Sequence, residues 1–317
     1  MQMLVTGGAG FIGSHLVERL LAEGHEVTCL DNFNHYYDPA VKRRNISPLL
    51  EDKRFTLVEA DIRDMDTLRS LFRERRFDKV IHLAAQPGVR LSLQNPGLYM
   101  NINVTGTLNL LEALREFGTE SFIFGSSSSV YGATEAIPFR EDGELKPISP
   151  YGASKRAGEL LCEVYRHVYR IPIVVLRFFT VYGPRQRPDM AIHKFIRQID
   201  RGGKISLYGD GLSRRDYTFV ADIVDGIVAA LDKGFAFETF NLGNSEPVAL
   251  RHLISTIEDC LGKKAVIENL PEQPGDPFVT YADIEKSGRL LDYRPQVKIE
   301  QGLERFVRWY EEAKKQG

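Results

Sequence analysis

Short apolar runs alternate with longer amphipathic stretches over roughly the first 180 residues of the chain. The apolar runs are rich in β-branched and aromatic residues, and we predict strands at 3–6, 27–30, 56–59, 79–83, 121–125 and 173–177. Between several of them the apolar positions recur at helical spacing, and we predict helices at 12–22, 65–74, 104–115 and 151–169. This alternation predicts βαβ units, and therefore an α/β fold with a Rossmann-type, doubly wound parallel sheet and helices on both faces.

The pattern changes after about residue 180, where prolines and glycines leave room only for short elements. We therefore predict a dinucleotide-binding domain over 1–178 and a smaller mixed α/β domain over most of 179–317. The run 240–243 reads as one more strand and turn, so 219–245 is expected to return to the first domain. An amphipathic helix is predicted at 299–315, and Asp222 is expected to be the N-cap of the helix that follows it.

Composition and charge exclude several classes of partner. Of the 317 residues, 43% are apolar and 26% charged, which is ordinary for a globular protein. The net charge of −2 gives no reason to expect nucleic acid or an anionic membrane as a partner. The local basic cluster at 42–44 is interpreted as a solvated helix face.

The cysteines and histidines form no pattern typical of a disulfide framework or a metal site. Cys29, Cys162 and Cys260 are far apart, and the seven histidines show no metal-ligand spacing, so no metal is expected. No charged and apolar leader precedes the first strand, and no apolar run approaches about 18 residues. A cytoplasmic protein is therefore expected.

A glycine-rich turn, GGAGFIG at 7–13, lies between the first predicted strand and the first predicted helix. Glycine lets the backbone turn tightly and approach a pyrophosphate, whose charge then faces the helix N-terminus. The spacing is GxxGxxG, and its place between a strand and a helix favours a dinucleotide site over a plain turn. The residues expected to contact the dinucleotide are Gly7, Gly10, Phe11, Ile12 and Gly13.

Asp31 ends the second predicted strand. A carboxylate there accepts the two hydroxyls of an adenosine ribose and repels a 2′-phosphate, so NAD is favoured over NADP. The alternative is that Asp31 is a turn aspartate, and Asn32 is open to either role.

Tyr151 and Lys155 lie four residues apart at the start of a predicted helix and so share one helix face. A phenol with an ordinary pKa near 10 is a poor base at neutral pH. A lysine ammonium and a cationic nicotinamide nearby stabilise the phenolate and lower that pKa. The pair then takes a proton from a sugar hydroxyl while a hydride leaves for NAD. A solvated helix face is the common alternative for YxxxK alone.

Further motifs follow these in a fixed order along the chain: LAA at 83–85, Asn103-Val104, SSSSVYG at 126–132, LRFF at 176–179 and RDY at 215–217. In this combination the chain resembles the extended short-chain dehydrogenases/reductases, and among them the nucleotide-sugar 4-epimerases, over essentially its whole length. The resemblance implies further cofactor-binding residues: Asp61 and Ile62 at the adenine, and Leu83, Ala84, Ala85, Gln86 and Asn103 near the diphosphate and nicotinamide ribose. Gln86 departs from the lysine that related epimerases often have there. Asp61 as a turn residue and Asn103 as a helix N-cap are the alternatives.

The resemblance also implies that the catalytic hydroxyl lies four residues before Tyr131, which is Ser127, with Ser126 as the alternative. Related 4,6-dehydratases have an Asp-Glu pair directly after this residue. Here Ser128 and Ser129 occupy those positions, and a hydroxyl is not a general acid or base near neutral pH. The implied reaction is therefore 4-epimerisation through a transient ketone, with hydride returned to the opposite face.

Four stretches, 31–38, 85–92, 177–191 and 273–276, are most similar to UDP-glucuronate 4-epimerases. That similarity implies the conversion of UDP-glucuronate to UDP-galacturonate. Arg187 would contact the sugar carboxylate together with Thr180 and Ser127 to Ser129, Arg215 would contact the diphosphate, and Asp276 a ribose hydroxyl. Lys194 and Phe195 are placed near the uracil.

Other functions stay open at this point. In a UDP-glucose or UDP-N-acetylglucosamine 4-epimerase, Arg185 and Arg187 would be solvated loop residues. A catalytically silent member of the fold is disfavoured because the tyrosine, lysine and serine are all present. The family resemblance also implies a homodimer, with 104–115 and 151–169 as the candidate interface helices.

Overall fold

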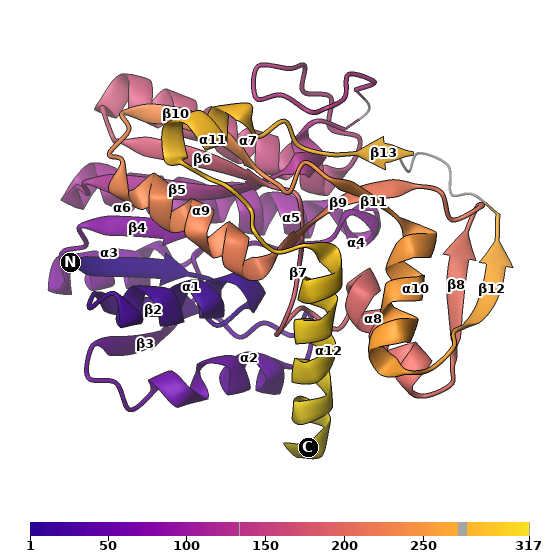
Figure 1. Ribbon diagram of the computed structural model, residues 1–317. Coiled ribbons are helices and arrows are strands. Elements are labelled where there is room, and N and C mark those ends of the chain that lie inside the picture. Colours follow the sequence, from indigo (N-terminus) through magenta and orange to yellow (C-terminus); the bar gives the residue numbers. More distant parts are fainter. Residues whose placement is uncertain (133, 272–277, 317) are drawn as a thin grey trace.

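Seven strands form the central sheet in the order β10–β6–β5–β4–β1–β2–β3, and every neighbouring pair is parallel (Figure 1). The computed structural model describes residues 1–132, 134–271 and 278–316. The strands are β1 (Gln2–Thr6), β2 (Glu26–Asp31), β3 (Phe55–Glu59), β4 (Lys79–His82), β5 (Ser121–Ser127), β6 (Ile173–Phe178) and β10 (Phe237–Leu242). The chain runs outward from β1 to β3 and then returns to β4 on the other side of β1. The predicted doubly wound α/β fold is confirmed, and its switch point lies between β1 and β4.

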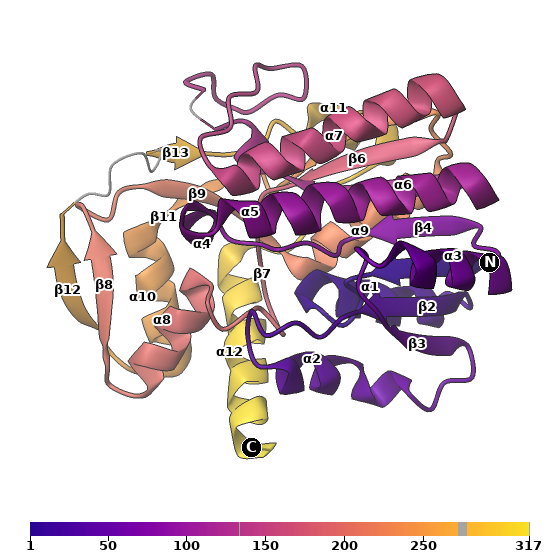
Figure 2. The same ribbon diagram turned by 180° about the vertical axis from the view of Figure 1, so that it is seen from behind.

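Helices cover both faces of this sheet (Figures 1 and 2). Helices α1 (Phe11–Ala22) and α9 (Val220–Asp232) pack on one face, where Leu16 and Ile227 join the larger apolar core. Helices α3 (Met65–Glu74), α6 (Gly106–Phe117) and α7 (Pro150–Tyr169) pack on the other. Neighbouring strand residues such as Leu4 and Val5 belong to different cores, as expected when side chains alternate across a sheet.

The six strands predicted before residue 180 are all present, and β10 confirms that the chain returns to the sheet after the change of pattern. One predicted helix begins later than expected. Residues 100–105 form a π-helical turn (η2, Met100–Thr105) before α6, and Gly106 then packs so closely that a Cβ would lie 2.4 Å from Cδ1 of Ile62. The short helices α2 (Pro39–Ile46), α4 (Val89–Gln94) and α5 (Pro96–Tyr99) were not predicted, since none is long enough for a clear helical period.

Smaller elements lie beside the carboxyl end of the sheet (Figure 1). Strand β9 (Arg214–Phe219) pairs with β7 (Thr180–Tyr182), β11 (Pro247–Ala249) and β13 (Val279–Thr280). Strands β8 (Lys204–Tyr208) and β12 (Val266–Leu270) form a separate parallel pair. The remaining elements are α8 (Ala191–Asp200), α10 (Leu250–Leu261), α11 (Glu285–Leu291), the predicted C-terminal helix α12 (Ile299–Gln316), and the 3₁₀ turns η1 (Ser47–Leu49) and η3 (Ser128–Val130).

One local prediction was wrong, and a second was wrong in part. Asp222 does not cap a helix, because α9 begins at Val220 directly after β9. Its carboxylate instead accepts the backbone N–H groups of Gln296 and Val297 at 3.0 and 3.1 Å. In the basic cluster at 42–44, Arg43 and Arg44 are exposed on α2 as predicted, but Lys42 is buried, with only 6% of it exposed.

The described residues give no sign of a disulfide, a metal cluster or a membrane span. All three cysteines are free thiols. Within 1–132, 134–271 and 278–316, no group of three or more His, Cys, Asp or Glu side chains is arranged to hold a metal ion. No helix in those ranges has both the length and the apolar character that crossing a bilayer requires.

Candidate active site

A cavity opens at the carboxyl ends of β1, β2, β4 and β5, at the switch point of the sheet. Ligands of doubly wound sheets bind at this position. The cavity is lined by many of the predicted cofactor residues: Gly7, Gly10, Phe11, Ile12, Gly13, Asp31, Asn32, Asp61, Ile62, Leu83, Ala84, Ala85, Tyr151 and Lys155. The structure thus brings together residues that are up to 148 positions apart in sequence (155 − 7 = 148).

The glycine turn is shaped for a close approach of backbone to ligand. Gly7 has φ of +70°, and a Cβ on it would lie 2.7 Å from the backbone N of Ala84. A Cβ on Gly13 would lie 2.2 Å from the carbonyl oxygen of Gly7. Gly10 is the N-cap of α1 and provides no side-chain cap, so the first N–H groups of the helix face the cavity lined by Gly10 to Gly13. This cradle fits a pyrophosphate group.

At the adenosine end, Asp31 both shapes the turn and lines the cavity. Its Oδ1 accepts the N–H of Phe33 at 2.9 Å, which is the turn role, and Lys42 Nζ lies 3.5 Å from the same oxygen. Asn32 Nδ2 donates to Asp61 at 2.8 Å. An ion pair with Arg63 lowers the pKa of Asp61 to about 2, so this carboxylate is ionised at neutral pH. Acidic acceptors at the predicted ribose and adenine positions fit NAD.

Lys42 is a cavity residue that sequence reasoning missed. It extends from α2 beneath the turn, where Asn34 Oδ1 also accepts from it at 3.2 Å. Its only sequence signal was its place in the second turn of a helix that begins at the Asp38 N-cap, which puts it on the same face as the buried Asn45 and Ile46.

Gln86 and Asn103 are buried, but they are not among the residues that line the cavity. The two hold each other: Gln86 N–H donates to Asn103 Oδ1 at 2.7 Å, and Asn103 Nδ2 donates to Gln86 O at 3.1 Å. Asn103 Nδ2 also contacts Ser154 Oγ at 2.9 Å, which ties the loop after β4 to α7. Their predicted cofactor contacts stay predictions, and the observed role is to support the loop that carries Ala84 and Ala85.

Helix α7 places Tyr151 and Lys155 at the inner end of the cavity. Ser149 caps the helix by accepting the N–H of Gly152 at 3.1 Å, and Pro150 is its first residue. Burial raises the pKa of Tyr151, whereas a hydrogen bond with Ser127 and the positive charge of Arg187 act in the opposite direction. Lys155 Nζ donates to the carbonyl oxygen of Gly125 at 2.7 Å. Burial lowers the pKa of Lys155 to about 8, with the nearby Glu159 carboxylate opposing that shift.

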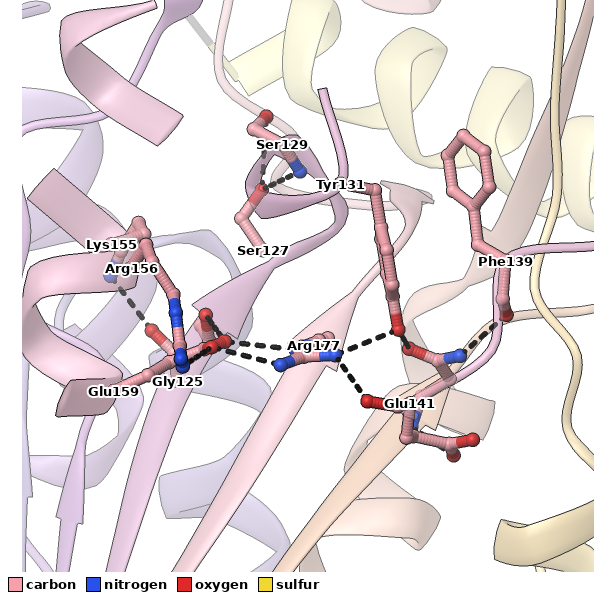
Figure 3. A network of polar contacts seen from close by, with 12 residues as sticks. Gly125, Ser127, Ser129, Tyr131, Phe139, Glu141, Lys155, Arg156, Glu159 and Arg177 are labelled. Carbon is pink, nitrogen blue, oxygen red and sulfur yellow. Dashed lines mark hydrogen bonds and ion pairs between the residues drawn. The ribbon is translucent and has the colours of Figure 1, made fainter. Parts of the chain in front are cut away.

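The serine run at 126–129 divides into two environments, and Figure 3 shows Ser127 and Ser129 together, apart from the ion pair of Glu159 and Arg177. Ser126 Oγ donates to Glu159 at 2.6 Å, and Glu159 is held by the guanidinium of Arg177 through two contacts of 2.9 Å. Ser127 lies at the end of β5, where its Oγ accepts the N–H of Ser129 at 3.2 Å and contacts the Ser129 hydroxyl. Ser126 lines the cofactor cavity but is committed to a buried ion-pair network, whereas Ser127 does not line that cavity and acts on the pKa of Tyr151 as a hydrogen-bond partner, so Ser127 as the catalytic hydroxyl stays a prediction.

Arg187 also lines the cofactor cavity, beside Tyr36 and Tyr151. Its Nε and Nη2 donate to the two oxygens of Asp189 at 2.9 Å each, and the Tyr36 hydroxyl donates to Asp189 at 3.1 Å. Arg187 is therefore not a solvated loop residue, since only 20% of its side chain is exposed. Neither Asp189 nor Tyr36 was predicted to belong to the site. Asp189 lies two residues after Arg187, but that spacing alone carries no chemistry.

A second, larger cavity adjoins the first at Tyr36, which lines both. Among its lining residues are the predicted Thr180, Arg215, Lys194 and Phe195, together with the unpredicted Ser206 and Tyr208. Ser127, Ser128 and Ser129 line neither cavity, and their predicted substrate contacts stay predictions. Asp276 lies outside the described residues.

The fold and this site define a dinucleotide-dependent enzyme: a glycine cradle at the switch point, an acidic strand end and a tyrosine–lysine pair at the far end of one cavity. The chain belongs to the NAD dependent epimerase/dehydratase family, whose sequence model matches residues 3–243. The resemblance to the extended short-chain dehydrogenases/reductases and their nucleotide-sugar epimerases is confirmed, and so is NAD as the cofactor.

Relatives support this assignment over the whole chain. A UDP-glucuronate 4-epimerase of Thermodesulfobacterium geofontis is 43% identical over 311 residues, which cover 98% of this chain and 96% of that protein. The crystal structure of UDP-glucuronic acid 4-epimerase from Bacillus cereus with UDP-glucuronic acid and NAD has a TM-score of 0.94 at 41% identity, covering 99% of this chain and 100% of that one. The UDP-glucose 4-epimerase of Thermus thermophilus in complex with NAD has a TM-score of 0.90 at 35% identity, covering 99% and 100%.

Proposed function

We propose that the protein interconverts UDP-glucuronate and UDP-galacturonate by NAD-dependent epimerisation at C4. The observation that carries this proposal is Arg187, a guanidinium that lines the cofactor cavity and acts electrostatically on Tyr151. A cation beside the catalytic base is where the C6 carboxylate of a uronic acid would lie once O4 is in reach of the tyrosine. The similarity to UDP-glucuronate 4-epimerases supports the same substrate.

In this proposal NAD accepts a hydride from C4 and later returns it to the opposite face. Tyr151 takes the proton from the 4-hydroxyl as the C4–H bond breaks, and Ser127 hydrogen-bonds the same oxygen and the tyrosine. Lys155, held by Gly125 O, supplies positive charge at the base of α7. The ketone then turns in the site, and Tyr151 gives its proton back to O4. Serines at 128 and 129 provide no acid–base pair for elimination at C5 and C6.

The pairing of Arg187 with Asp189 sets a condition on this proposal. A guanidinium that already holds one carboxylate offers a second one little net charge. The uronate must therefore replace Asp189 on at least one arm of Arg187. Tyr36 makes that exchange feasible, because its hydroxyl still donates to Asp189 when the arginine turns away. A ketone flanked by this carboxylate is a β-keto acid, and a carboxylate held near the ketone plane resists loss of carbon dioxide.

A neutral UDP-hexose is the second candidate substrate, and the same Arg187–Asp189 pair is the observation that favours it. The charges of Arg187 and Asp189 cancel each other. A neutral hydroxymethyl group at C6 can therefore bind beside them without leaving either charge without a partner. Incubation of the pure protein with UDP-glucuronate and with UDP-galactose, followed by separation of the products, decides between them. We expect UDP-galacturonate from the first and no product from the second. UDP-glucose from UDP-galactose, with UDP-glucuronate unchanged, would establish the neutral substrate instead.

We further propose that residues 1–178 with 219–245 bind NAD, and that most of 179–317 binds the nucleotide sugar. The distribution of the cavity linings supports this division, since only the second cavity is lined mainly from 180 onward. We also propose a cytoplasmic location, supported by three free cysteines, which suit a reducing compartment.

We propose a homodimer formed through α6 and α7 (Figure 2). Helix α7 exposes Leu160, Val164 and Val168, which are four residues apart and therefore lie on one face. These side chains are 47%, 52% and 56% exposed, which is unusual for large aliphatic residues aligned along a helix. A second copy of the same face would cover them around a two-fold axis.

A further inference from the structure

The loop at 183–190, between β7 and α8, carries Arg187 into the cofactor cavity, and it is fixed from two sides. On one side the loop holds itself to α8. Gln186 is buried, its Nε2 donates to Val181 O at 3.0 Å, and its Oε1 accepts the N–H of His193 at 3.2 Å. These contacts anchor the middle of the loop next to Arg187.

On the other side the loop rests on α1. His15 Nε2 donates to the carbonyl oxygen of Pro184 at 2.9 Å, because that oxygen can only accept. Arg185 Nη2 donates to Glu18 Oε1 at 2.6 Å, with 18% of the arginine side chain and 34% of the glutamate exposed. His15 and Glu18 are three residues apart and share one face of the helix. We call these two contacts the α1 latch.

Arg185 is held in a conformation that it would not adopt freely. Its φ is +64°, in the left-handed region that residues with a Cβ avoid. Such a backbone persists where surrounding contacts determine it, and for Arg185 the Glu18 carboxylate is one of them. The turn sends the two loop arginines to different partners: Arg185 reaches α1, and Arg187 reaches the cavity and Asp189.

The α1 latch contributes less to the stability of the folded state than a fully hydrogen-bonded ion pair would. Arg185 Nη1 is buried and makes no hydrogen bond to the part of the chain that the structure describes. A buried donor without an acceptor costs free energy, so the pair does not make full use of the guanidinium. Its geometric effect is specific, since it joins the second and third turns of α1 to a loop two residues before Arg187.

We propose that Glu18 and His15 are positioning residues, which fix Arg187 through Arg185 and Pro184 and so set how the substrate carboxylate is held. This rests on the proposed uronate substrate. Helix α1 also provides the phosphate cradle at its N-terminus, one to two turns from the latch. One rigid helix thereby fixes both the cofactor end and the carboxylate-binding loop, in a single frame with the tyrosine.

The test uses the full chain loaded with NAD and the variant Glu18→Gln, which keeps the side-chain size and removes the charge. The matched control is Glu23→Gln, which breaks a surface ion pair with Arg19 on the same helix. We expect Glu18→Gln to raise KM for UDP-glucuronate roughly tenfold, with kcat within about twofold, because the contact with the carboxylate is made in the ground state as well. The fraction of decarboxylated UDP-pentose product should rise at least threefold. The control should change neither value.

Amide hydrogen exchange provides a readout that needs no turnover. The N–H groups of Gln186 and Met190 are bonded within the loop, to Gly183 O and Arg187 O. Their exchange should be at least fivefold faster in Glu18→Gln than in Glu23→Gln. Equal exchange and equal KM in the two variants would overturn the proposal. If the wild type does not convert UDP-glucuronate, the proposed substrate is wrong, and the exchange measurement still decides whether the latch fixes the loop.

A second variant separates positioning from stability. Arg185→Gly removes the ion pair and also relieves the left-handed strain, so we expect no loss of thermal stability. KM should still rise as in Glu18→Gln, and the double variant should be no worse than either single variant. Additive effects, or a KM like that of the wild type, would contradict the latch.

Discussion

At the scale of single residues, we propose that Arg187 decides the choice of substrate, because Asp189 already holds the guanidinium that a substrate carboxylate would need. In this structure Asp189 accepts hydrogen bonds from both Nε and Nη2 of Arg187. The sequence placed Arg187 near the substrate through a family resemblance, but nothing in RQRPD indicated that the chain supplies its own counter-ion. In this proposal the ion pair of Arg187 and Asp189 must open to bind a uronate, and it can stay closed when a neutral sugar binds.

Arg187→His removes the bidentate donor and leaves a shorter polar side chain at the position. We expect kcat/KM for UDP-glucuronate to fall roughly a hundredfold, in line with the loss of a charge-assisted pair, and UDP-pentose to appear as a by-product. Product analysis by chromatography measures both effects. Kinetics and products equal to those of the wild type would show that Arg187 does not hold the carboxylate.

The lowered pKa of Lys155 makes the stability of the folded protein depend on pH. Burial lowers its pKa to about 8 in the folded protein, against an ordinary value of 10.5 in the unfolded chain. Below pH 8 both states carry the charge, and the folded state bears the cost of burying it. Between about pH 8 and 10.5 the unfolded chain binds more protons, so this group makes the folded protein more stable as pH rises.

Lys155→Met should therefore melt at a higher temperature than the wild type at pH 7, and the difference should shrink as the pH approaches 10.5. Paired thermal melts from pH 7 to 10 measure it. A variant that melts lower than the wild type at pH 7 would show that the hydrogen bond to Gly125 O outweighs desolvation. Activity should be lost in either case, because the buried charge that lowers stability is also the one that the reaction uses.

At the scale of elements, the sequence predicted the features that depend on the repeat of apolar positions and on the glycines and prolines that interrupt it. Strands β1 to β6, helix α7 and the glycine turn all follow from local patterns. It did not predict what depends on tertiary contacts. The π-helical turn before Gly106 and the burial of Lys42 have no signal in the local pattern, and the partners of Asp222 lie far along the chain at Gln296 and Val297.

Adding one methyl group to the glycine turn tests whether the turn binds the pyrophosphate of NAD. In Gly13→Ala the new Cβ would lie 2.2 Å from Gly7 O and 2.8 Å from the Cα of Gly8, so the turn must open. We expect the affinity for NAD to fall more than tenfold, measured by calorimetry on cofactor-free protein. Gly97→Ala is the control, because nothing lies within 4 Å of its added Cβ. Equal affinity in the two variants would place the pyrophosphate elsewhere.

At the scale of the whole molecule, the sheet and the smaller elements form two adjoining cavities that meet at Tyr36. The sequence predicted both regions, but not that Tyr36 stands between them and holds Asp189. Such a residue is visible only when 31–38 and 180–190 are placed side by side, which no local pattern achieves.

The proposed dimer is a second property of the whole molecule. Val164→Glu places a charge in the centre of the exposed apolar face of α7 and should convert a dimer into a monomer in light scattering coupled to gel filtration. Val266→Glu is the control, since Val266 is 47% exposed on β12. A wild-type protein that is monomeric at micromolar concentration would contradict the proposed interface.

The proposed reaction requires that hydride leaves C4 of a UDP-uronate and returns to the same carbon from the other side. It is tested most directly with UDP-glucuronate that carries deuterium at C4, incubated in ordinary water and followed by NMR. We expect UDP-galacturonate that retains the deuterium at C4, and no product from Tyr151→Phe. Replacement of the deuterium by solvent hydrogen, or the absence of UDP-galacturonate, would contradict it.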